Sequence, residues 1–481
     1  MKILMASSEV HPFSKTGGLA DMVGALAKTL ATLGHEVSVL TPLYKGIRER
    51  FPAMERMDLE IRLPLGGRMI EAGLWQMTVA TGETIYFVEQ PEFYERDGIY
   101  GTSGGVFSDN AARFLFFAKC AAYLARHLPW QPEVLHLHDW QAAPAALVVN
   151  HQKYREGWGN APRVCLTLHN VAYQGHFSGD TFGLLNLPWD YFHAEGAEFY
   201  AGFNCLKAGI VYADLLTTVS PRYAREITLD LGHGMEGMLR KRAAALTGIL
   251  NGVDYAEWRT ENNPHLVHPF NASKLRDKDR NKLALQEELG LPVELGTPLF
   301  ASVTRLAEQK GMDLLLPALE EMLAAHEMQF VLLGSGDPAL EQAFRVLAER
   351  FPNKVIAKIG YDAGLSHRIE AASDFFLMPS RYEPCGLNQM YSLRYGAIPI
   401  VRRTGGLDDS VVDFNDDPLR ANGVKFDELA APALANAIRK ALRIYADKEL
   451  LNLLRRRGMA ADFSWEQSAH EYLRIFQPPP V

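Results

Sequence analysis

The chain has 481 residues, 48% of them hydrophobic and 22% charged, so it is too long for a single compact core and too apolar to be disordered. Its 49 basic and 57 acidic side chains give a net charge of -8, which argues against general affinity for nucleic acid. The four cysteines are too scattered for a disulfide framework, no apolar stretch is long enough to span a bilayer, and no secretory signal opens the chain, so we expect a cytoplasmic protein.

The first half of the chain alternates short apolar runs with segments of helical length. The opening strand ends at Ser7-Ser8, and the pair Gly17-Gly18 precedes a helical pattern over 19–30. Further runs of strand length follow at 36–40, 84–88, 134–137, 164–168 and 215–219. This alternation predicts a mostly parallel sheet wrapped by helices.

A second series of the same kind occupies the other half. Its apolar runs fall at 299–303, 329–333, 355–359, 375–378 and 398–401, with a helical pattern over 312–325. We therefore predict an α/β protein with two Rossmann-like doubly wound domains. A turn signal at 251–254 marks the crossover, and we place the domains at 1–245 and 246–459, followed by a closing segment over 460–481.

Paired glycines occur twice where a strand is expected to lead into a helix. Lys15-Thr16-Gly17-Gly18 places a cation directly before a helix-opening loop, a pattern that favours an anionic ligand group. Thr404-Gly405-Gly406-Leu407 repeats the pattern in the second half. Tight turns of purely structural purpose, and an isolated surface lysine, explain these residues equally well.

Two further motifs follow predicted strands of the second half. Arg305 and Lys310 flank the end of one strand and the start of the next helix, where two cations suit a diphosphate and could neutralise it as a leaving group. Glu383, next to Pro384, stands at a strand-to-helix turn and could bind sugar hydroxyls or stabilise a positively charged sugar centre. A salt-bridged loop and a helix-capping carboxylate are the structural alternatives.

Histidines follow two strands of the first half. His136 and His138 alternate along a strand, but we expect no metal site because no third or fourth ligand stands out nearby. His169 ends the next strand, where a histidine with satisfied hydrogen bonds is the usual interpretation. The loop from Gly334 to Ala339 formally fits the dinucleotide fingerprint GxGxxA, which is weak evidence for an NAD-dependent oxidoreductase.

Taken together, these motifs resemble those of bacterial glycogen synthases and the catalytic part of plant starch synthases. The matching segments span nearly the whole chain and are 15–21, 136–140, 169–170 with 173–175, 251–254, 305–311, 381–387 and 403–407. The resemblance implies two facing domains of the GT-B type with the active site in the cleft between them. It implies that the first domain binds the glucan acceptor, that the second binds the nucleotide-sugar donor, and that a helix within 460–481 returns to the first domain. It implies transfer of glucose from ADP-glucose to the non-reducing end of an α-1,4-glucan (glycogen or a maltooligosaccharide), with retained configuration and no metal or other cofactor.

The resemblance also implies roles for individual residues. Glu383, His169, Arg305 and Lys310 would be catalytic, with Arg305 and Lys310 binding the departing diphosphate and Glu383 the donor sugar. Lys15 with Gly17 and Gly18 would hold phosphates, and Asp139 with His169 would contact the glucosyl unit. The remaining substrate-binding residues would be Asp21, Asn251, Tyr361, Cys385, Gly386, Leu387, Thr404, Gly405 and Gly406.

Three alternatives stay open at this point: an oxidoreductase, a glucan-binding protein without turnover, and a related transferase with another acceptor or with UDP-glucose as donor. Whether Glu383 forms a covalent intermediate is open as well. No nucleic acid, membrane or obligate protein partner is predicted.

Overall fold

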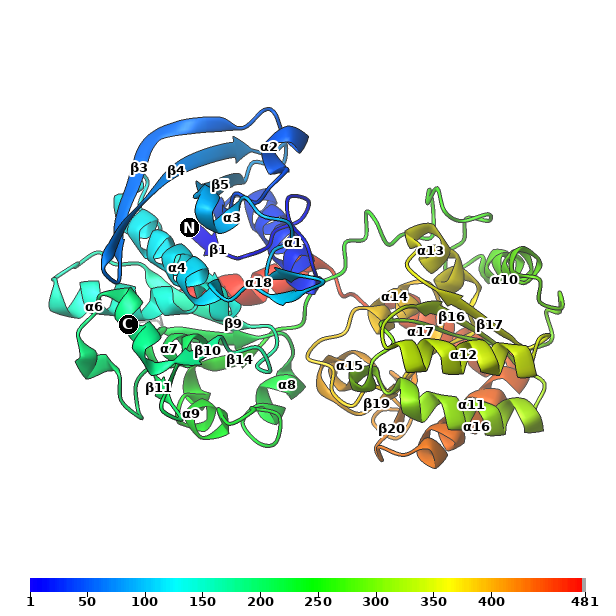
Figure 1. The fold of residues 1–481 in the computed structure, drawn as a ribbon. Helices are drawn as coiled ribbons and strands as arrows, with labels where there is room; N and C mark the ends of the chain where they lie inside the picture. The colour runs from blue at the N-terminus through cyan, green and yellow to red at the C-terminus, as the bar shows by residue number, and fades with distance from the viewer. Residues whose placement is uncertain (478–481) are drawn as a thin grey trace. The chain divides into compact units, whose positions relative to one another are not determined.

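The structure, a computed structural model, describes residues 1–477, and the chain divides into two compact units. Unit 1 comprises Met1–Val219, Ala224–Gly252 and the chain from Trp465 onward, whereas unit 2 comprises Ser220–Tyr223 and Val253–Ser464 (Figure 1). Unit 1 therefore extends past the predicted boundary at 245, because β14 (Leu246–Gly248) pairs with β13 (Leu215–Thr218). Of the predicted closing segment, residues 478–481 lie outside the described residues.

A nine-stranded sheet runs through unit 1 in the order β14-β13-β9-β8-β1-β2-β5-β4-β3. Besides β13 and β14, its strands are β1 (Lys2–Ala6), β2 (Glu36–Pro42), β3 (Glu55–Leu65), β4 (Arg68–Thr78), β5 (Thr84–Glu89), β8 (Val134–His138) and β9 (Arg163–Leu168). Only β4 pairs antiparallel to its neighbours, and the strand order reverses between β1 and β8.

Helices pack on this sheet in two groups. The longer ones are α1 (Gly18–Thr32), α4 (Asn110–His127), α6 (Pro144–Arg155), α7 (Cys205–Tyr212) and α18 (Trp465–Phe476). Helix α6 packs on α4 and α7, whereas α1 packs on α18. The side chains of Trp465, Tyr472 and Phe476 are buried, so the last described helix forms part of the core of unit 1. A small antiparallel sheet of β10 (His176–Ser178), β12 (Gly202–Asn204) and β11 (Glu198–Phe199) lies beside α9 (Glu236–Lys241) (Figure 1).

Unit 2 contains a parallel sheet in the order β17-β16-β15-β18-β19-β20. Its strands are β15 (Leu299–Val303), β16 (Gln329–Gly334), β17 (Val355–Ile359), β18 (Phe375–Met378), β19 (Ile398–Arg402) and β20 (Val424–Phe426). Its longer helices are α10 (Leu275–Leu289), α11 (Met312–Ala325), α12 (Pro338–Arg350), α13 (Ala363–Ala372), α16 (Ala431–Ala446) and α17 (Lys448–Ala460). In sequence order the strands read 3-2-1-4-5-6, which is the Rossmann arrangement. The predicted α/β class with two doubly wound domains is confirmed.

The local sequence explains why these elements form. The strands of unit 2 are almost entirely apolar because both faces of the sheet are covered by helices, which fill two separate hydrophobic clusters. Helix starts carry matching caps: the carboxylate of Asp337 accepts from the first backbone N–H groups of α12, and Asp447 does the same for α17.

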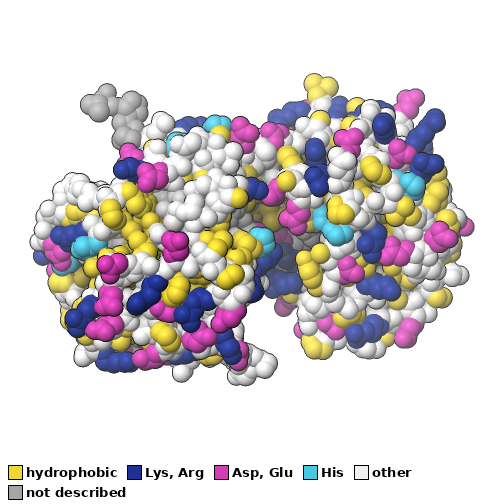
Figure 2. Space-filling view, turned by 90° about the horizontal axis from the view of Figure 1, so that it is seen from above, with side chains coloured by type: hydrophobic (Ala, Val, Ile, Leu, Met, Phe, Trp, Pro, Cys, Tyr) yellow, Lys and Arg dark blue, Asp and Glu magenta, His cyan; other side chains and the backbone are white. Residues whose placement is uncertain are grey.

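On the face shown in Figure 2, basic and acidic side chains are interspersed over both units. Within residues 1–477, no helix is both long and apolar enough to cross a membrane.

Candidate active site

The candidate residues of both units gather at the carboxyl ends of parallel strands. In unit 2 the strand order reverses between β15 and β18, and the loops after these two strands carry Lys310 and Glu383. In unit 1 it reverses between β1 and β8, whose following loops carry Lys15 and Asp139. Ligands of open α/β sheets bind at this reversal, because the two loops diverge there and leave a crevice.

Lys310 and Glu383 form a nearly buried ion pair in unit 2. The ammonium Nζ of Lys310 lies 2.6 Å from Oε2 of Glu383, and their side chains are 18% and 8% exposed. Ser380 donates its hydroxyl to the same carboxylate oxygen at 3.0 Å. Ser380 and Glu383 both follow β18, whereas Lys310 follows the neighbouring strand β15. This arrangement suits a pair of opposite charges that act on one ligand.

The glycines around Glu383 are required by packing. A Cβ atom on Gly405 would lie 1.9 Å from the carbonyl oxygen of Glu383, and one on Gly406 would lie 2.0 Å from that of Cys385. The left-handed backbone of Gly386, with a φ of 71°, turns the chain from this loop into α14 (Asn388–Arg394). The amide of Gln389 closes the turn by donating to the carbonyl groups of Cys385 and Gly386. Gly405 and Gly406 thus hold the loop that bears Glu383.

The other predicted residues of unit 2 lie at the same edge with different exposure. Arg305 is exposed and donates to Oε1 of Gln309 at 3.2 Å, within the loop that also bears Lys310. Thr404 is buried at the cap of α15 (Gly405–Ser410), and Leu387 caps α14. Tyr361 follows β17 and is 86% exposed, so its ring is available to a ligand.

The loop with the GxGxxA pattern is filled by the protein itself. Positions 334 and 336 need glycine because a Cβ atom there would lie 1.9 Å from the carbonyl oxygen of Thr304 and 2.2 Å from that of Leu306. The carboxylate of Asp337 accepts from the backbone N–H groups of Ala339 and Leu340, where a dinucleotide would place its pyrophosphate. These contacts favour a structural role for the pattern.

The loop after β1 combines an exposed cation with a buried carboxylate. Lys15 lies 2.8 Å from Asp21 in an exposed ion pair. Glu9, which the sequence analysis did not single out, is 2% exposed and accepts from Tyr100 and Thr16 hydroxyl groups at 2.6 and 2.7 Å and from the Thr16 backbone. The sequence feature that could have indicated Glu9 is its position shortly after the buried strand β1.

Gly17 and Gly18 differ from the glycines of unit 2. A Cβ atom at either position would meet no other atom within 4 Å. Packing therefore does not require these two glycines, whereas close approach of a ligand to the backbone would explain them.

Asp139 and His169 are brought together at the ends of β8 and β9. The backbone of Asp139 is left-handed, with a φ of 55°, and its Oδ1 accepts from the backbone N–H of His169 at 2.8 Å. Burial raises the pKa of Asp139 to about 7, against the opposing effect of hydrogen bonds from the backbone of His169 and Asn170. Burial also lowers the pKa of His169 to about 3, so its imidazole is neutral at neutral pH.

The two strand histidines lie behind this pair. The rings of His136 and His138 are 4.1 Å apart, and Nδ1 of His138 lies 3.1 Å from Nε2 of His169. The ring of His136 contacts Tyr472 and Phe476 of α18, and burial lowers its pKa to about 3. In residues 1–477, no group of three or more His, Cys, Asp and Glu side chains is arranged to hold a metal ion.

Asn251 follows β14, which is an edge strand of the sheet of unit 1. Its Oδ1 atom is buried and has no hydrogen-bond partner among the described residues. A hydroxyl group of a ligand is one donor that could satisfy this oxygen.

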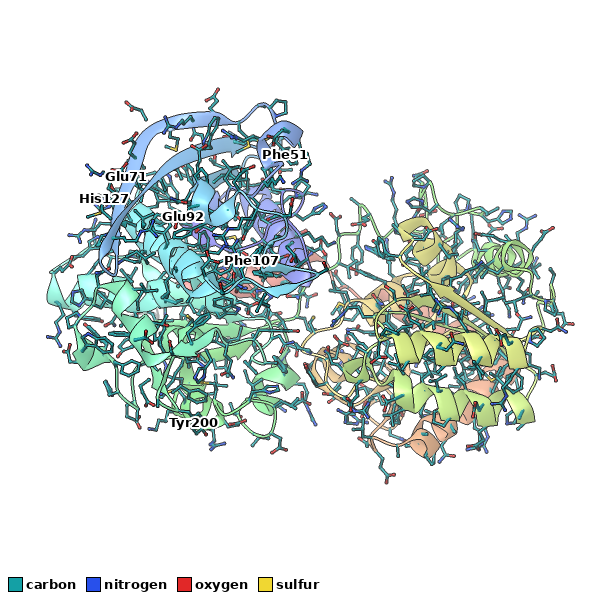
Figure 3. All side chains as sticks on the ribbon, viewed as in Figure 1. Phe51, Glu71, Glu92, Phe107, His127 and Tyr200 are labelled. Carbon is teal, nitrogen blue, oxygen red and sulfur yellow. The ribbon has the colours of Figure 1, made fainter. Side chains whose placement is uncertain are left out.

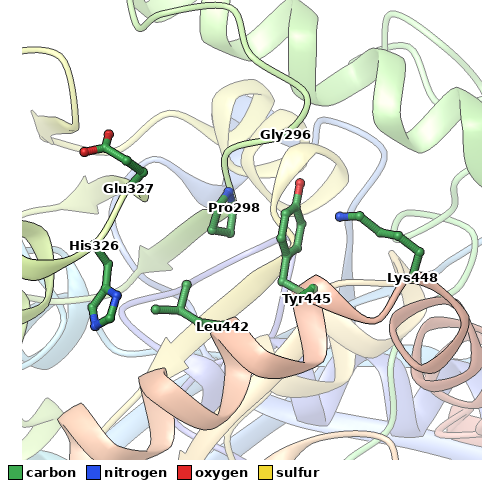
Figure 4. A pocket seen from close by; sticks show the side chains of 8 residues that line it. Gly296, Pro298, His326, Glu327, Leu442, Tyr445 and Lys448 are labelled. Carbon is green, nitrogen blue, oxygen red and sulfur yellow. The ribbon is translucent and has the colours of Figure 1, made fainter.

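A separate cavity of about 360 Å³ lies at the opposite edge of the sheet of unit 2 (Figure 4). Pro298 and Glu327, which precede β15 and β16, line it together with Tyr445 and Lys448. It therefore lies at the amino ends of the strands, whereas Lys310 and Glu383 lie at the carboxyl ends.

Comparison with known proteins agrees with this geometry. The family model described as starch synthase catalytic domain matches residues 2–241, and the model described as glycosyl transferases group 1 matches residues 290–458. The chain is 46% identical over 490 residues to a glycogen synthase of Myxococcus xanthus, covering 99% of both chains. It is 44% identical over 478 residues to one of Koribacter versatilis, covering 99% of this chain and 98% of the relative.

Solved structures extend the comparison. The catalytic domain of starch synthase IV from Arabidopsis thaliana, bound to ADP and acarbose, is 33% identical with a TM-score of 0.86 and covers 99% of this chain and 98% of that one. Sucrose-phosphate synthase from Thermosynechococcus elongatus, 18% identical with a TM-score of 0.60 and covering 98% of both chains, shares the fold.

Two Rossmann-like units and matches to two glycosyltransferase models define the class: the chain is a glycosyltransferase enzyme of the GT-B type. Within that class it belongs to the glycogen synthase and starch synthase family. The expectation of glycogen synthesis rested on motif order, and these relatives confirm it.

Proposed function

We propose that the protein transfers glucose from ADP-glucose to the non-reducing end of an α-1,4-glucan and retains the anomeric configuration. The observation that carries the proposal is the Lys310–Glu383 pair, 2.6 Å apart and nearly buried at the strand reversal of unit 2. Among the relatives, the starch synthase bound to ADP and acarbose supports a nucleotide and a glucan-like ligand.

The chemistry assigned to unit 2 is stabilisation of the leaving group. The bond between C1 of glucose and the diphosphate oxygen breaks, and the 4-hydroxyl oxygen of the acceptor forms the new bond on the same face. Its proton passes to the departing phosphate, so ADP leaves with the charge that Arg305 and Lys310 neutralise. Throughout this step, Glu383 binds the hydroxyl groups of the donor sugar, and its negative charge stabilises the positive charge that develops on the sugar. This route needs no covalent intermediate, metal or redox cofactor.

Unit 1 supplies the acceptor side in this proposal. Neutral His169 can donate or accept a hydrogen bond, and it is oriented by Asp139 through a backbone contact of 2.8 Å. Both residues would contact the glucosyl unit, and Lys15 with the open backbone at Gly17 and Gly18 would bind phosphate. Because all four cysteines are buried free thiols, we also propose a reducing, cytoplasmic location.

The test is release of nucleoside diphosphate from ADP-glucose and UDP-glucose, each with and without glycogen. Purified protein should release ADP only when glycogen is present. Glu383→Gln, which keeps the shape but removes the charge, should lower kcat by roughly 100-fold or more while the fold stays intact. Release of UDP alone would show that the donor is UDP-glucose. A normal rate in Glu383→Gln would refute the role of Glu383.

A further inference from the structure

The hairpin between β11 and β12 carries two residues that do not suit its turn. Its strands pair Glu198 with Phe203 and Phe199 with Gly202, which leaves Tyr200 and Ala201 as a two-residue loop. Both have left-handed backbone, with φ values of 48° and 62°. Asn-Gly is the usual sequence in such a turn, because other residues adopt this conformation at a cost in free energy. A tyrosine at this position therefore indicates a use for its side chain.

The ring of Tyr200 is held outward on an aromatic base. It is 81% exposed, and its centroid lies 4.5 Å from that of Phe199 with the two ring planes at 74°. Phe199 in turn contacts His176, and Gly234 lets the next loop approach it, since a Cβ atom there would lie 3.0 Å from the Phe199 ring. Figure 3 shows Tyr200 at the rim of unit 1, close to β11 and α9. Most of the aromatic ring is thus left open to water.

A cavity of about 320 Å³ adjoins this ring, and its charges balance. Tyr200 and Phe199 line it together with two acidic and two basic side chains, which are Glu195, Glu198, Lys207 and Lys241. Lys241 pairs with Glu195 at 2.5 Å, and the ammonium of Lys207 donates to the carbonyl oxygens of Ala194 and Glu198. With no surplus charge, the cavity favours a neutral ligand over an anion or a cation.

Flat aromatic and polar groups together match a sugar chain. The apolar face of a pyranose ring packs on an aromatic ring, and carboxylate and ammonium groups bind hydroxyls. The cavity volume falls in the range of roughly 300–1,000 Å³ that is common for ligand sites. A neutral polyhydroxyl ligand is thus the chemical class that the lining fits.

The cavity is connected to the loop that follows His169. Gln174, five residues after His169, donates its amide to the carbonyl oxygen of His233, and Asn204 donates to Oε1 of Gln174. His233 directly precedes Gly234 and Met235, which line the cavity. One hydrogen-bonded path therefore joins the loop after His169 to the wall of the cavity.

We propose that Tyr200 and the adjoining cavity form a binding site for an α-glucan chain, outside the reacting centre. The proposal rests on the proposed function for the identity of the sugar. The site holds a stretch of the acceptor polymer and thereby raises the affinity for long glucans, whereas acceptors of a few glucose units do not reach it.

Electrophoresis in native gels that contain glycogen tests this site without relying on turnover. Tyr200→Asn should weaken retardation by glycogen roughly three- to tenfold, the loss expected for one aromatic contact. Because asparagine tolerates left-handed backbone, the same variant should keep or raise the melting temperature, which separates lost binding from unfolding. Tyr200→Phe should retain binding. Tyr154→Asn, a matched change at a tyrosine 67% exposed on α6, should have no effect.

Kinetics on two acceptors complete the test. For Tyr200→Asn, KM for glycogen should rise while KM for maltotriose and kcat stay unchanged. An active parent protein whose Tyr200→Asn variant is retarded as strongly as the parent overturns the site and leaves the proposed function intact. A parent that releases no ADP overturns the proposed function, and retardation that disappears in Tyr200→Asn would then still support the glucan site.

Discussion

Replacing one glycine of each Gly-Gly pair by alanine should give opposite results in the two units. In Gly406→Ala, the new Cβ atom would lie 2.0 Å from the carbonyl oxygen of Cys385, whereas an ordinary contact begins at 3.4 Å. The loop that bears Glu383 or the start of α15 must move to make room. The atoms that the new Cβ would meet belong to the backbone of Cys385 and cannot move aside as a flexible side chain could. Overpacking of this kind lowers the free energy of unfolding by about 3 kcal/mol.

Gly17→Ala is the matched control. Its Cβ atom would meet nothing within 4 Å, and Gly17 has extended backbone, with a φ of -158°, that alanine also adopts. We expect a stability change of about 0.5 kcal/mol or less. Turnover or donor affinity should nevertheless fall, because the added methyl group obstructs the backbone approach that the open space allows.

The assay is thermal unfolding of both variants at one scan rate, beside ADP release. For a unit of this size, a decrease of about 3 kcal/mol in the free energy of unfolding lowers the melting temperature by about 6–12 °C. Gly406→Ala should show that shift and Gly17→Ala should not. An unchanged transition in Gly406→Ala would refute the reasoning from close packing, and a fully active Gly17→Ala would remove the ligand-based explanation of the first pair.

Two further outcomes are expected. Lys15→Ala should raise KM for ADP-glucose and leave kcat unchanged, because a charge that pairs equally with the ground state and the transition state contributes only to binding. A change confined to kcat would instead assign Lys15 to the chemical step. Acidification from pH 7 to pH 5 should lower the melting temperature, because burial lowers the pKa of His136 and His169 from 6.5 to about 3 and the unfolded chain binds protons that the native state excludes. Burial also raises the pKa of Asp139 and Glu370, which acts in the opposite direction, but it lowers the pKa of His138 and His367 as well, so four histidines oppose two acids. His136→Phe should flatten the pH dependence, and an equally steep dependence would contradict this account.

The sequence predicted the central strands that are buried on both faces and missed the long antiparallel pair β3 and β4 at one end of the unit 1 sheet. The runs at 299–303 and 375–378 match β15 and β18 residue for residue, because helices on both sides demand continuous apolar sequence. Strands β3 and β4 are each eleven residues long, yet neither was predicted. β3 mixes charged and apolar residues and contains Pro64, as expected for an edge strand with one face in water.

The site was predictable where position along a strand determines it. Glu383, Lys310, Asp139 and His169 all follow strands, and the carboxyl edge of a parallel sheet collects such residues. The contact of the Asp139 carboxylate with the backbone of His169 was not predictable, because it depends on left-handed backbone at Asp139 that no glycine or turn pattern nearby indicates. The same limit applies to Tyr200, whose significance lies in a turn that its sequence does not favour.

The two Gly-Gly pairs show why a shared motif does not imply a shared mechanism. In unit 2, packing against Glu383 and Cys385 already accounts for the pair, so the proposed anion binding there relies on the side chains of Arg305 and Lys310. In unit 1 the space beside Gly17 and Gly18 is open, so a phosphate group there can approach the backbone itself, with Lys15 as the nearby charge. Added salt should therefore weaken a contact at Lys15, which is exposed, more than one at Lys310, which is nearly buried.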